Sequence, residues 1–297
     1  MSDPGRGTGP APRGSWTGEG PVGIVGLGLM GGSLARALKA LEPAPSVLAS
    51  SRDPLDLAAA RDLGVLDQGF SEPEGVMDQA RTVILAVPLG GVQRLMQEHA
   101  ARLRDKALVM DVAGLKAPVL HQARAVEITD RFVGAHPMTG GEGSGFQGSR
   151  GDLFPGSVVW LTHQEADASV QEAARAFWTG LGATPRWTDA EGHDEVMAWC
   201  SHLPQLVSNA LAGALDSAGY TPDDLGPGGR DMIRLSGSSP EMWRDLLQRS
   251  APQVGLGLQS VSRALQVLAD LLARRDLDAV AAFMERTRGW RGEGPWS

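Results

Sequence analysis

A glycine pattern that follows a strand-like run constrains the fold of this chain most strongly. The apolar run at residues 22–26 ends in GLGLMG over residues 26–31, which matches GxGxxG. Where such a pattern closes a strand and opens a helix, glycine lets the backbone approach a dinucleotide closely. The helix that we expect over residues 29–41 would hold a pyrophosphate on its first amides. The pattern predicts a dinucleotide-binding unit, whereas the alternative is a tight turn without a ligand.

Short β-rich runs alternate with helical patterns from residue 21 to about residue 188. Continuous apolar runs such as VILAV at residues 83–87 are typical of parallel strands covered on both faces. Helical patterns such as residues 29–41 and 92–103 lie between these runs. We expect strands at residues 22–26, 46–50, 82–87, 107–112, 131–135, 157–161 and 184–187. This alternation predicts an α/β Rossmann-type dinucleotide-binding domain over residues 21–188.

The strand signals stop after residue 188, and helical patterns fill residues 189–297. Long apolar helices are expected at residues 254–272 and 277–288. An earlier helix carries an apolar stripe formed by Val196, Trp199, Cys200, Leu203 and Val207, with Asp194, Ser201, Gln205 and Ser208 opposite. We expect an all-α C-terminal domain for substrate binding and dimerisation. Its apolar faces suit a homodimer interface, and an ordinary core explains them equally well.

The composition of this 297-residue chain leaves room for two domains and excludes several classes of function. A net charge of −8 without a cluster of basic residues argues against a nucleic-acid partner. Cys200 is the only cysteine, which excludes intrachain disulfides and cysteine-ligated zinc. No apolar run reaches the roughly 20 residues that span a membrane. Residues 1–20 lack a signal-peptide core and are expected to be a disordered leader, so a cytoplasmic location is expected.

A histidine within a glycine-rich loop is the candidate catalytic residue. His136 lies in GAHPMTGGEGSG at residues 134–145. Histidine is the side chain best able to accept a proton near neutral pH. Because a nicotinamide cofactor takes up only a hydride, the matching proton needs such an acceptor. The fingerprint and this loop together predict a dehydrogenase, whereas the alternative is a structural histidine bonded to the backbone.

The residues after the second expected strand bear on the choice of cofactor. NAD-binding chains place an acidic residue there for the ribose hydroxyls, and this chain has Ser51 followed by Arg52. A serine removes the repulsion against a 2′-phosphate, and an arginine can pair with that phosphate. We therefore favour NADP, with NAD as the alternative if Asp53 reaches the ribose instead.

Further polar residues in the second half are weaker candidates. His193 and His202 have no third ligand nearby in the sequence, so no metal site is expected. His193 suits polar contact with a substrate, and His202 suits a structural role. Arg230 and Arg234 follow a flexible glycine turn, where a guanidinium could bind a carboxylate or lie in solvent. The SSPE sequence at residues 238–241 is typical of a helix start with a capping box.

This set of motifs resembles the prephenate/arogenate dehydrogenase family of tyrosine biosynthesis. In the first half the matching motifs are GLGLMGGS at residues 26–33, AVP at 86–88, DVAGLK at 111–116 and HPM at 136–138. In the second half they are HD at residues 193–194, SHLPQ at 201–205, RDMIR at 230–234 and PEMW at 240–243. They occur in the family's order, and the histidine loop and the last two motifs are the specific ones.

The resemblance implies a reaction and a set of site residues. Prephenate or arogenate would lose a hydride to NAD(P)+ and then CO₂, giving 4-hydroxyphenylpyruvate or tyrosine. His136 would accept the proton of the ring hydroxyl, and Arg234 would hold the ring carboxylate. The other implied substrate residues are Glu142, His193, Gln205, Asp231 and Trp243. The expected cofactor residues are Gly26, Gly28, Leu29, Met30, Gly31, Ser51, Arg52, Val87 and Pro88.

Two positions depart from the family pattern. Gly114 stands where the family usually has a serine bonded to the catalytic histidine, so water or another hydroxyl would have to orient His136. Gln205 stands where some prephenate-specific members have histidine, which tilts the expected substrate toward arogenate. An amide can bind either a keto or an amino group, so the tilt is slight. Tyrosine could still inhibit by occupying the active site.

Two other functions fit parts of the sequence. A non-catalytic NAD(P)-binding sensor would tolerate the glycine at position 114. A β-hydroxyacid dehydrogenase shares the opening fingerprint but relies on a lysine in its helical domain, and residues 189–297 contain no lysine. Purified protein would distinguish the sensor, which binds cofactor without turnover, from an enzyme that produces reduced nicotinamide.

Overall fold

The computed structural model describes residues 18, 20–140, 143–162 and 165–291. Glu142 and, apart from residues 18 and 20, the expected leader over residues 1–20 lie outside this described part. The chain divides into two compact units. The first contains the residues up to Met197 together with Glu241–Leu246, and the second contains Ala198–Pro240 and the residues from Leu247 onward.

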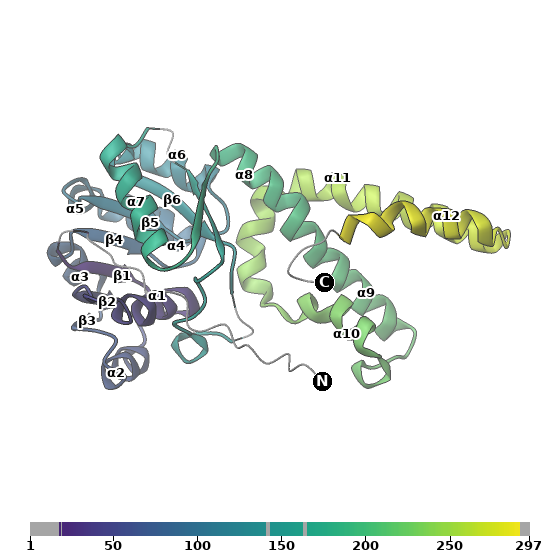
Figure 1. The fold of residues 1–297 in the computed structure, drawn as a ribbon, viewed down its shortest axis with the longest axis horizontal. Coiled ribbons are helices and arrows are strands. Elements are labelled where there is room, and N and C mark those ends of the chain that lie inside the picture. Colours follow the sequence, from purple (N-terminus) through teal and green to yellow (C-terminus); the bar gives the residue numbers. More distant parts are fainter. Residues whose placement is uncertain (1–17, 19, 141–142, 163–164, 292–297) are drawn as a thin grey trace, which may run out of the picture. The chain divides into compact units, whose positions relative to one another are not determined.

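The described residues of the first unit form an eight-stranded sheet (Figure 1). Its strands are β1 (Val22–Val25), β2 (Val47–Ser50), β3 (Gln68–Phe70), β4 (Thr82–Leu85), β5 (Leu108–Asp111), β6 (Phe132–Pro137), β7 (Val158–Thr162) and β8 (Thr184–Trp187). Their order is β3-β2-β1-β4-β5-β6-β7-β8, and the neighbouring pairs are parallel except for β6 and β7. The direction of strand order reverses between β1 and β4, and open α/β sheets bind ligands at such a point.

Helices cover both faces of this sheet. They are α1 (Leu29–Lys39), α2 (Pro54–Asp62), α3 (Pro73–Gln79), α4 (Leu89–Glu98), α5 (Ala100–Arg104), α6 (Ala117–Ala125), α7 (Ala168–Gly180) and α8 (Ala190–Met197). Successive strand residues point to opposite faces, so Ile24 packs in one buried cluster with residues of α1 and α7. Val25 packs in the other cluster with residues of α3, α4 and α6. Burial on both faces explains why these strands read as continuous apolar runs.

The expected α/β fold is confirmed, and the seven expected strands are present within two residues of their expected bounds. Sequence reasoning missed β3, which has three residues with a central glycine and is too short to show a period. The single helix expected over residues 92–103 is wrong, because α4 ends before His99 and α5 starts after it. Helix α8, which follows the expected boundary at residue 188, belongs by its contacts to the first unit.

The described residues of the second unit are helical, as expected (Figure 1). They form α9 (Leu203–Ser217), α10 (Pro227–Ile233), most of α11 (Pro240–Ala273) and α12 (Leu277–Arg288). The expected glycine turn before Arg230 is wrong, because Gly228 and Gly229 lie in α10, which starts at Pro227 with Gly226 as its N-cap. Helix α11 starts where the sequence indicated, but the side chain of its N-cap, Ser239, makes no capping hydrogen bond. No helix in the described part of the chain is long and apolar enough to cross a bilayer.

The apolar stripe expected around residue 200 is not a buried face. Val196 and Trp199 are 47% and 43% exposed, whereas Gln205 and Ser208 on the expected polar side are buried. A π-helical stretch, Ala198–His202, lies between α8 and α9. Because a π-helical turn contains an extra residue, one helical period cannot run through both helices.

Candidate functional site

A groove of about 810 Å³ lies at the carboxyl ends of β1, β2 and β4, where the strand order reverses. Six of the expected cofactor residues line it, namely Gly26, Gly28, Ser51, Arg52, Val87 and Pro88. Leu29, Met30 and Gly31 are not part of this lining, because they form the first turn of α1 and Met30 packs against the core. The size and place of the groove fit a dinucleotide.

Two glycines allow α1 to start close against β1. Gly26 has a φ of +103°, and a Cβ there would lie 2.6 Å from the carbonyl oxygen of Ala86. A Cβ at Gly31 would overlap the carbonyl oxygen of Gly26. A side chain at Gly31 would therefore push the helix away from the strand, and one at Gly26 would collide with the residues after β4. Gly31 thus acts on the packing beneath the groove and not on its lining.

The first turn of α1 fits an anionic group. Its N-cap, Gly28, supplies no side chain to the first amides, and the turn contains no acidic residue. The first amides of a helix have no acceptor within the helix, and the positive end of the helix dipole lies there. These are the conditions under which a helix start binds a phosphate, so the residues present fit a pyrophosphate.

The residues after β2 are arranged by the start of α2. The Asp53 carboxylate accepts a hydrogen bond from the amide of Leu55 at 2.9 Å and caps that helix. Ser51 Oγ accepts a hydrogen bond from the Asp53 amide at 3.2 Å. Arg52 lines the groove, and its guanidinium makes no hydrogen bond or ion pair with another described residue. Asp53 is therefore engaged in helix capping, while the cation beside it is available to a ligand.

His136 is half-buried near the carboxyl end of β6, where it lies opposite Trp160 of β7. The neighbouring parallel strand β5 ends at Asp111, so His136 extends past it at the edge where parallel strands end. The loop after β5 returns toward the imidazole, and a Cβ built on Gly114 would lie 3.9 Å from His136 Nε2. This loop and the end of β6 together form the surroundings of the ring.

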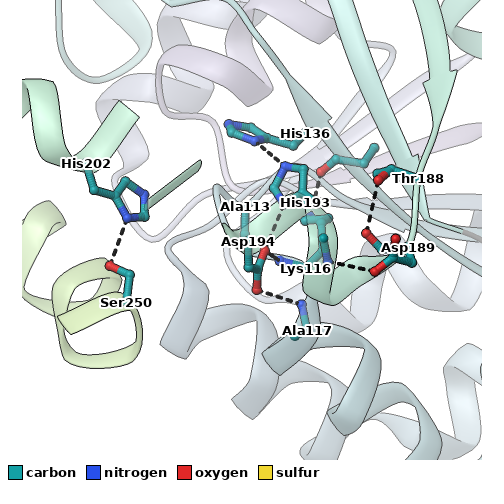
Figure 2. A network of polar contacts seen from close by, with 12 residues as sticks. Ala113, Lys116, Ala117, His136, Thr188, Asp189, His193, Asp194, His202 and Ser250 are labelled. Carbon is teal, nitrogen blue, oxygen red and sulfur yellow. Dashed lines mark hydrogen bonds and ion pairs between the residues drawn. The ribbon is translucent and has the colours of Figure 1, made fainter. Parts of the chain in front are cut away.

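A buried imidazole from α8 adjoins His136 and is itself backed by a carboxylate from the same helix (Figure 2). His136 Nδ1 lies 3.0 Å from Nε2 of His193, which is only 2% exposed. The two rings meet edge to face, with an interplanar angle of 75°. On its far side, His193 Nδ1 lies 2.7 Å from Oδ1 of Asp194. Asp194 belongs to the HD motif, but the sequence did not indicate a role for it.

Asp194 is held in turn by the first turn of α6. The amides of Lys116 and Ala117 donate hydrogen bonds to its two carboxylate oxygens at 2.7 and 3.0 Å. Anionic side chains are stabilised at the start of a helix. The chain of contacts therefore runs from the ring of His136 through His193 and Asp194 to the backbone of α6 (Figure 2).

A fully buried ion pair lies under the same loop. The Lys116 ammonium donates hydrogen bonds to the Asp111 carboxylate and, at 2.6 Å, to the carbonyl oxygen of Ala135. Burial raises the pKa of Asp111 and lowers the pKa of Lys116, because both charged forms lose their hydration, and their mutual attraction opposes this. The pair ties the end of β5 to the residue before His136. Sequence reasoning gave it no role, since a lysine in a motif is as easily exposed.

The first turns of α11 belong to the first unit and bring Trp243 into it. Leu246 packs against the core, and its Cδ2 would lie 3.4 Å from a Cβ on Gly114. Asp245 lines the dinucleotide groove. Trp243 is half-buried and lies three residues before Leu246, so the two side chains share one helix face. Two of the expected substrate residues, Trp243 and His193, thus lie in the same unit as His136.

Three expected substrate residues lie in the second unit. Gln205 is buried, and its Nε2 donates hydrogen bonds to Leu235 O at 2.6 Å and to Asn209 Oδ1 at 2.9 Å. It thereby holds the 3₁₀ turn Arg234–Gly237 against α9. Arg234 and Asp231 are exposed, and neither side chain makes a hydrogen bond or ion pair with another described residue.

His202 is buried in the second unit, where its Nδ1 lies 2.8 Å from Oγ of Ser250 (Figure 2). This contact between α11 and the end of the π-helical stretch fits the structural role expected for it. Among the described residues, no group of three or more histidine, cysteine or acidic side chains is placed to hold a metal ion.

Known proteins match both halves of the chain. The profile of the prephenate dehydrogenase nucleotide-binding domain matches residues 34–185, and that of the prephenate dehydrogenase dimerization domain matches residues 189–286. A prephenate dehydrogenase of Bacillus subtilis is 27% identical over 279 residues, which are 90% of this chain and 74% of the relative. A cyclohexadienyl dehydrogenase of Zymomonas mobilis is 28% identical over 86% of this chain and 90% of the relative.

A solved structure has a similar fold. The prephenate dehydrogenase of A. aeolicus, in complex with hydroxyphenyl propionate and NAD+, is similar with a TM-score of 0.80 and 29% sequence identity. The match covers 92% of this chain and 98% of that one.

Proposed function

Because the chain belongs to the prephenate dehydrogenase family, we propose that it oxidises and decarboxylates prephenate or arogenate. It is an NAD(P)-dependent dehydrogenase. The products are CO₂ and either 4-hydroxyphenylpyruvate or tyrosine. One observation carries the proposal: a single unit contains the dinucleotide groove and, on the same edge of its sheet, a histidine whose ring is contacted at 3.0 Å by buried His193.

The groove residues bind the cofactor in this proposal. When bound, the nicotinamide cofactor supplies the acceptor for the substrate's hydride. The first amides of α1, at Leu29 and Met30, bind the pyrophosphate, which the absence of acidic residues from that turn supports. Val87 and Pro88 form the groove wall after β4. These residues orient the ligand, and orientation supplies a large part of the rate in such a reaction.

His136 acts as the general base. The O–H bond of the ring hydroxyl breaks, and an N–H bond forms at Nε2 of His136, while the hydride leaves the ring carbon that bears this hydroxyl. The ring carboxylate then departs as CO₂, and the ring becomes aromatic, which makes the reaction effectively irreversible. The imidazolium returns its proton to water before the next turnover.

Arg234 binds the ring carboxylate in the proposed site. A guanidinium binds a carboxylate with two parallel hydrogen bonds, and that of Arg234 is exposed and not engaged with other described residues. Gln205 supports it indirectly, because Gln205 holds the turn that starts at Arg234. Asp231, Trp243 and Glu142 are proposed to contact the rest of the substrate. Both amide hydrogens of Gln205 bond to other residues. Gln205 therefore gives no reason to prefer one substrate, and prephenate and arogenate both remain in the proposal.

We favour NADP over NAD. Asp53, the carboxylate that could have bound the ribose hydroxyls, caps α2. Arg52 lines the groove and can pair with a 2′-phosphate. A carboxylate placed at Ser51 would repel that phosphate. The Ser51→Asp variant therefore tests the preference for NADP over NAD.

The protein is proposed to work as a homodimer, and tyrosine is proposed to compete with the substrate. The match of residues 189–286 to a dimerization domain supports the first proposal. The second follows from the reaction, because tyrosine has the ring that aromatisation produces and would occupy the same place.

A comparison of four substrate–cofactor pairs tests the proposed function. Purified protein is given prephenate or arogenate with NAD+ or NADP+, and the formation of reduced nicotinamide is followed by absorbance. We expect turnover of at least one substrate and a higher kcat/KM with NADP+. In Ser51→Asp the preference should move toward NAD+. Tight cofactor binding with no turnover of either substrate would overturn the proposal and point to a sensor.

A further inference from the structure

The family serine next to the catalytic histidine is absent from this chain, yet the ring of His136 is not left to solvent. The position of that serine is Gly114, where a Cβ would lie 3.9 Å from His136 Nε2. In its place the structure has an imidazole on the opposite nitrogen, because His193 Nε2 lies 3.0 Å from His136 Nδ1. The sequence led us to expect water or a hydroxyl beside His136, and the imidazole of His193 is a contact that this expectation did not include.

The protonation of the two rings follows from Asp194. The carboxylate of Asp194 accepts hydrogen bonds from the amides of Lys116 and Ala117. A carboxylate held by such donors acts as an acceptor only. The contact of 2.7 Å between Asp194 Oδ1 and His193 Nδ1 is therefore made by a proton on His193 Nδ1. Neutral His193 then presents a lone pair on Nε2, since one ring nitrogen of a neutral imidazole donates and the other accepts.

The same logic assigns the protonation of His136. Because His193 Nε2 is an acceptor, the contact at 3.0 Å requires the proton of His136 to lie on Nδ1. Nε2 of His136 then carries the lone pair, and it is the nitrogen on the side of the Gly114 loop. The network thus sets which nitrogen can act as a base, as a carboxylate does for the histidine of a catalytic triad.

We propose that His193 and Asp194 are positioning residues that hold His136 as the Nδ1–H tautomer, with Nε2 ready to accept the substrate's proton. This inference rests on the proposed function and gives His193 a role other than the substrate contact that the family resemblance implies. When His136 takes up the proton, its new positive charge is shared through the two N–H bonds with the carboxylate of Asp194. No proton has to leave His193 for this stabilisation.

The burial of the network supports a fixed role. His193 is 2% exposed and cannot exchange its two ring partners for water without moving α8. Asp194 is anchored on two backbone amides of α6, so its oxygens have a fixed direction. His136 itself is only half-buried. The rigid part of the network therefore lies behind the reactive atom, as preorganised sites require.

The ring tautomers are the direct test and need neither substrate nor turnover. In protein labelled with ¹⁵N-histidine, two-bond ¹H–¹⁵N correlations distinguish Nδ1–H from Nε2–H rings, and single substitutions assign the signals. In the full chain at neutral pH, we expect both His136 and His193 as Nδ1–H tautomers. In Asp194→Asn, the amide can donate to His193 Nδ1, so both rings should change to Nε2–H. Finding His136 as Nε2–H in the unsubstituted protein would overturn the inference.

Kinetics of the same variants give the second readout. We expect Asp194→Asn to lower kcat by about 10²-fold or more, as a wrong tautomer does in a triad, with cofactor Kd unchanged within about twofold. The matched control is Glu195→Gln, which removes the same charge from an exposed position on the same helix. Wild-type kcat in Asp194→Asn with unchanged tautomers would contradict the proposal.

A second pair of variants covers the case in which Asp194→Asn does not fold. His193→Leu removes the acceptor for His136 Nδ1–H, whereas His193→Gln keeps a hydrogen-bond acceptor on a side chain of similar length. We expect His193→Gln to retain at least about tenfold more kcat than His193→Leu. Equal losses would overturn the positioning role. If the tautomers are as expected but neither substrate is turned over, the proposed function fails while the assignment of the network holds.

Discussion

Side chains at the carboxyl end of the sheet differ in burial, and burial sets what each can do. Lys116 and Asp111 are fully buried, and their charged groups bond to each other and to the backbone of Ala113 and Ala135. His136, one residue further along β6, is half-buried and can meet a ligand. A buried ion pair contributes little net stability but becomes costly when one partner is removed, because the other charge stays without water. The pair is therefore a structural support for the end of β6 that carries His136.

Removal of the buried ammonium should destabilise the protein strongly. We expect Lys116→Met to lower the free energy of unfolding by about 3–5 kcal/mol, measured by urea denaturation. The matched control is Lys39→Met, because the ammonium of Lys39 pairs with Asp67 at 2.7 Å on a part-exposed surface. That change should cost about 0–1 kcal/mol. Similar losses in the two variants would show that burial of the Lys116 pair is unimportant.

Removal of the proposed base should abolish most turnover while the groove stays intact. We expect His136→Asn to lower kcat by about 10²–10⁴-fold, the contribution of a general base. Cofactor Kd, measured by titration calorimetry, should change little, since His136 does not line the groove. His121→Asn serves as the control, because the His121 side chain is 65% exposed. Turnover near that of the control would exclude His136 as the base.

Helix α1 shows how a single element connects packing with ligand binding. Its first turn starts directly after the groove residue Gly28, and Gly31 lets this turn approach the carbonyl oxygen of Gly26. The same helix packs against the segment that follows the histidine loop, since a Cβ at Gly32 would lie 2.7 Å from Phe146 and 2.8 Å from Ser149. Arg36 adds a hydrogen bond to Ser149 Oγ at 2.8 Å. The spacing of these glycines thus serves the helix's neighbours on both sides.

Substitution of glycine by alanine should have opposite effects in α1 and α9. Alanine in a helix is favoured over glycine by about 1 kcal/mol, and Gly213→Ala in α9 should follow this rule, since a Cβ there meets nothing within 4 Å. Gly31→Ala should instead lower the melting temperature and raise the cofactor Kd at least tenfold, because the new methyl group overlaps backbone. Calorimetry and cofactor titration check both. A stabilised Gly31→Ala would refute the packing argument.

At the scale of the whole molecule, the second unit has apolar side chains that its own packing does not cover. Leu265 and Leu272 of α11 are 59% and 56% exposed, and they lie seven residues apart and so on one helix face. Met284 of α12 is 64% exposed. Exposed apolar faces of this kind mark interaction surfaces, and residues 189–286 match a dimerization domain. We therefore expect these helices to form the interface between two copies of the chain.

A charge on the apolar face should weaken the dimer. We expect Leu265→Glu to raise the dimer dissociation constant by about 10²-fold, because a carboxylate without a partner is costly to bury. Sedimentation velocity over a range of concentrations measures this. Gln79→Glu adds the same charge at an exposed position of the first unit and should leave the dimer intact. A Leu265→Glu protein that dimerises as tightly as the control would place the interface elsewhere.

The amino-acid sequence by itself determined the sheet, the helix after the fingerprint and the place of His136. These depend on local order: apolar runs, glycine spacing and residues that are neighbours in the chain. The short strand β3 and the break at His99 were missed because three residues, or one, carry too little periodic signal. In the second unit, the π-helical stretch Ala198–His202 moved the buried face away from the one that a regular period indicates.

Only the tertiary structure decided what holds His136. His193 and Asp194 lie more than fifty positions after it in the chain, and Asp194 meets α6 at an even greater separation, 78 positions from Lys116. No spacing rule predicts such contacts, because they arise when α8 packs beside α6 at the end of the sheet. The same holds for the burial of Lys116, which reads as an ordinary lysine until the fold surrounds it. Local patterns specify elements, whereas the neighbours of a reactive atom depend on how distant elements pack.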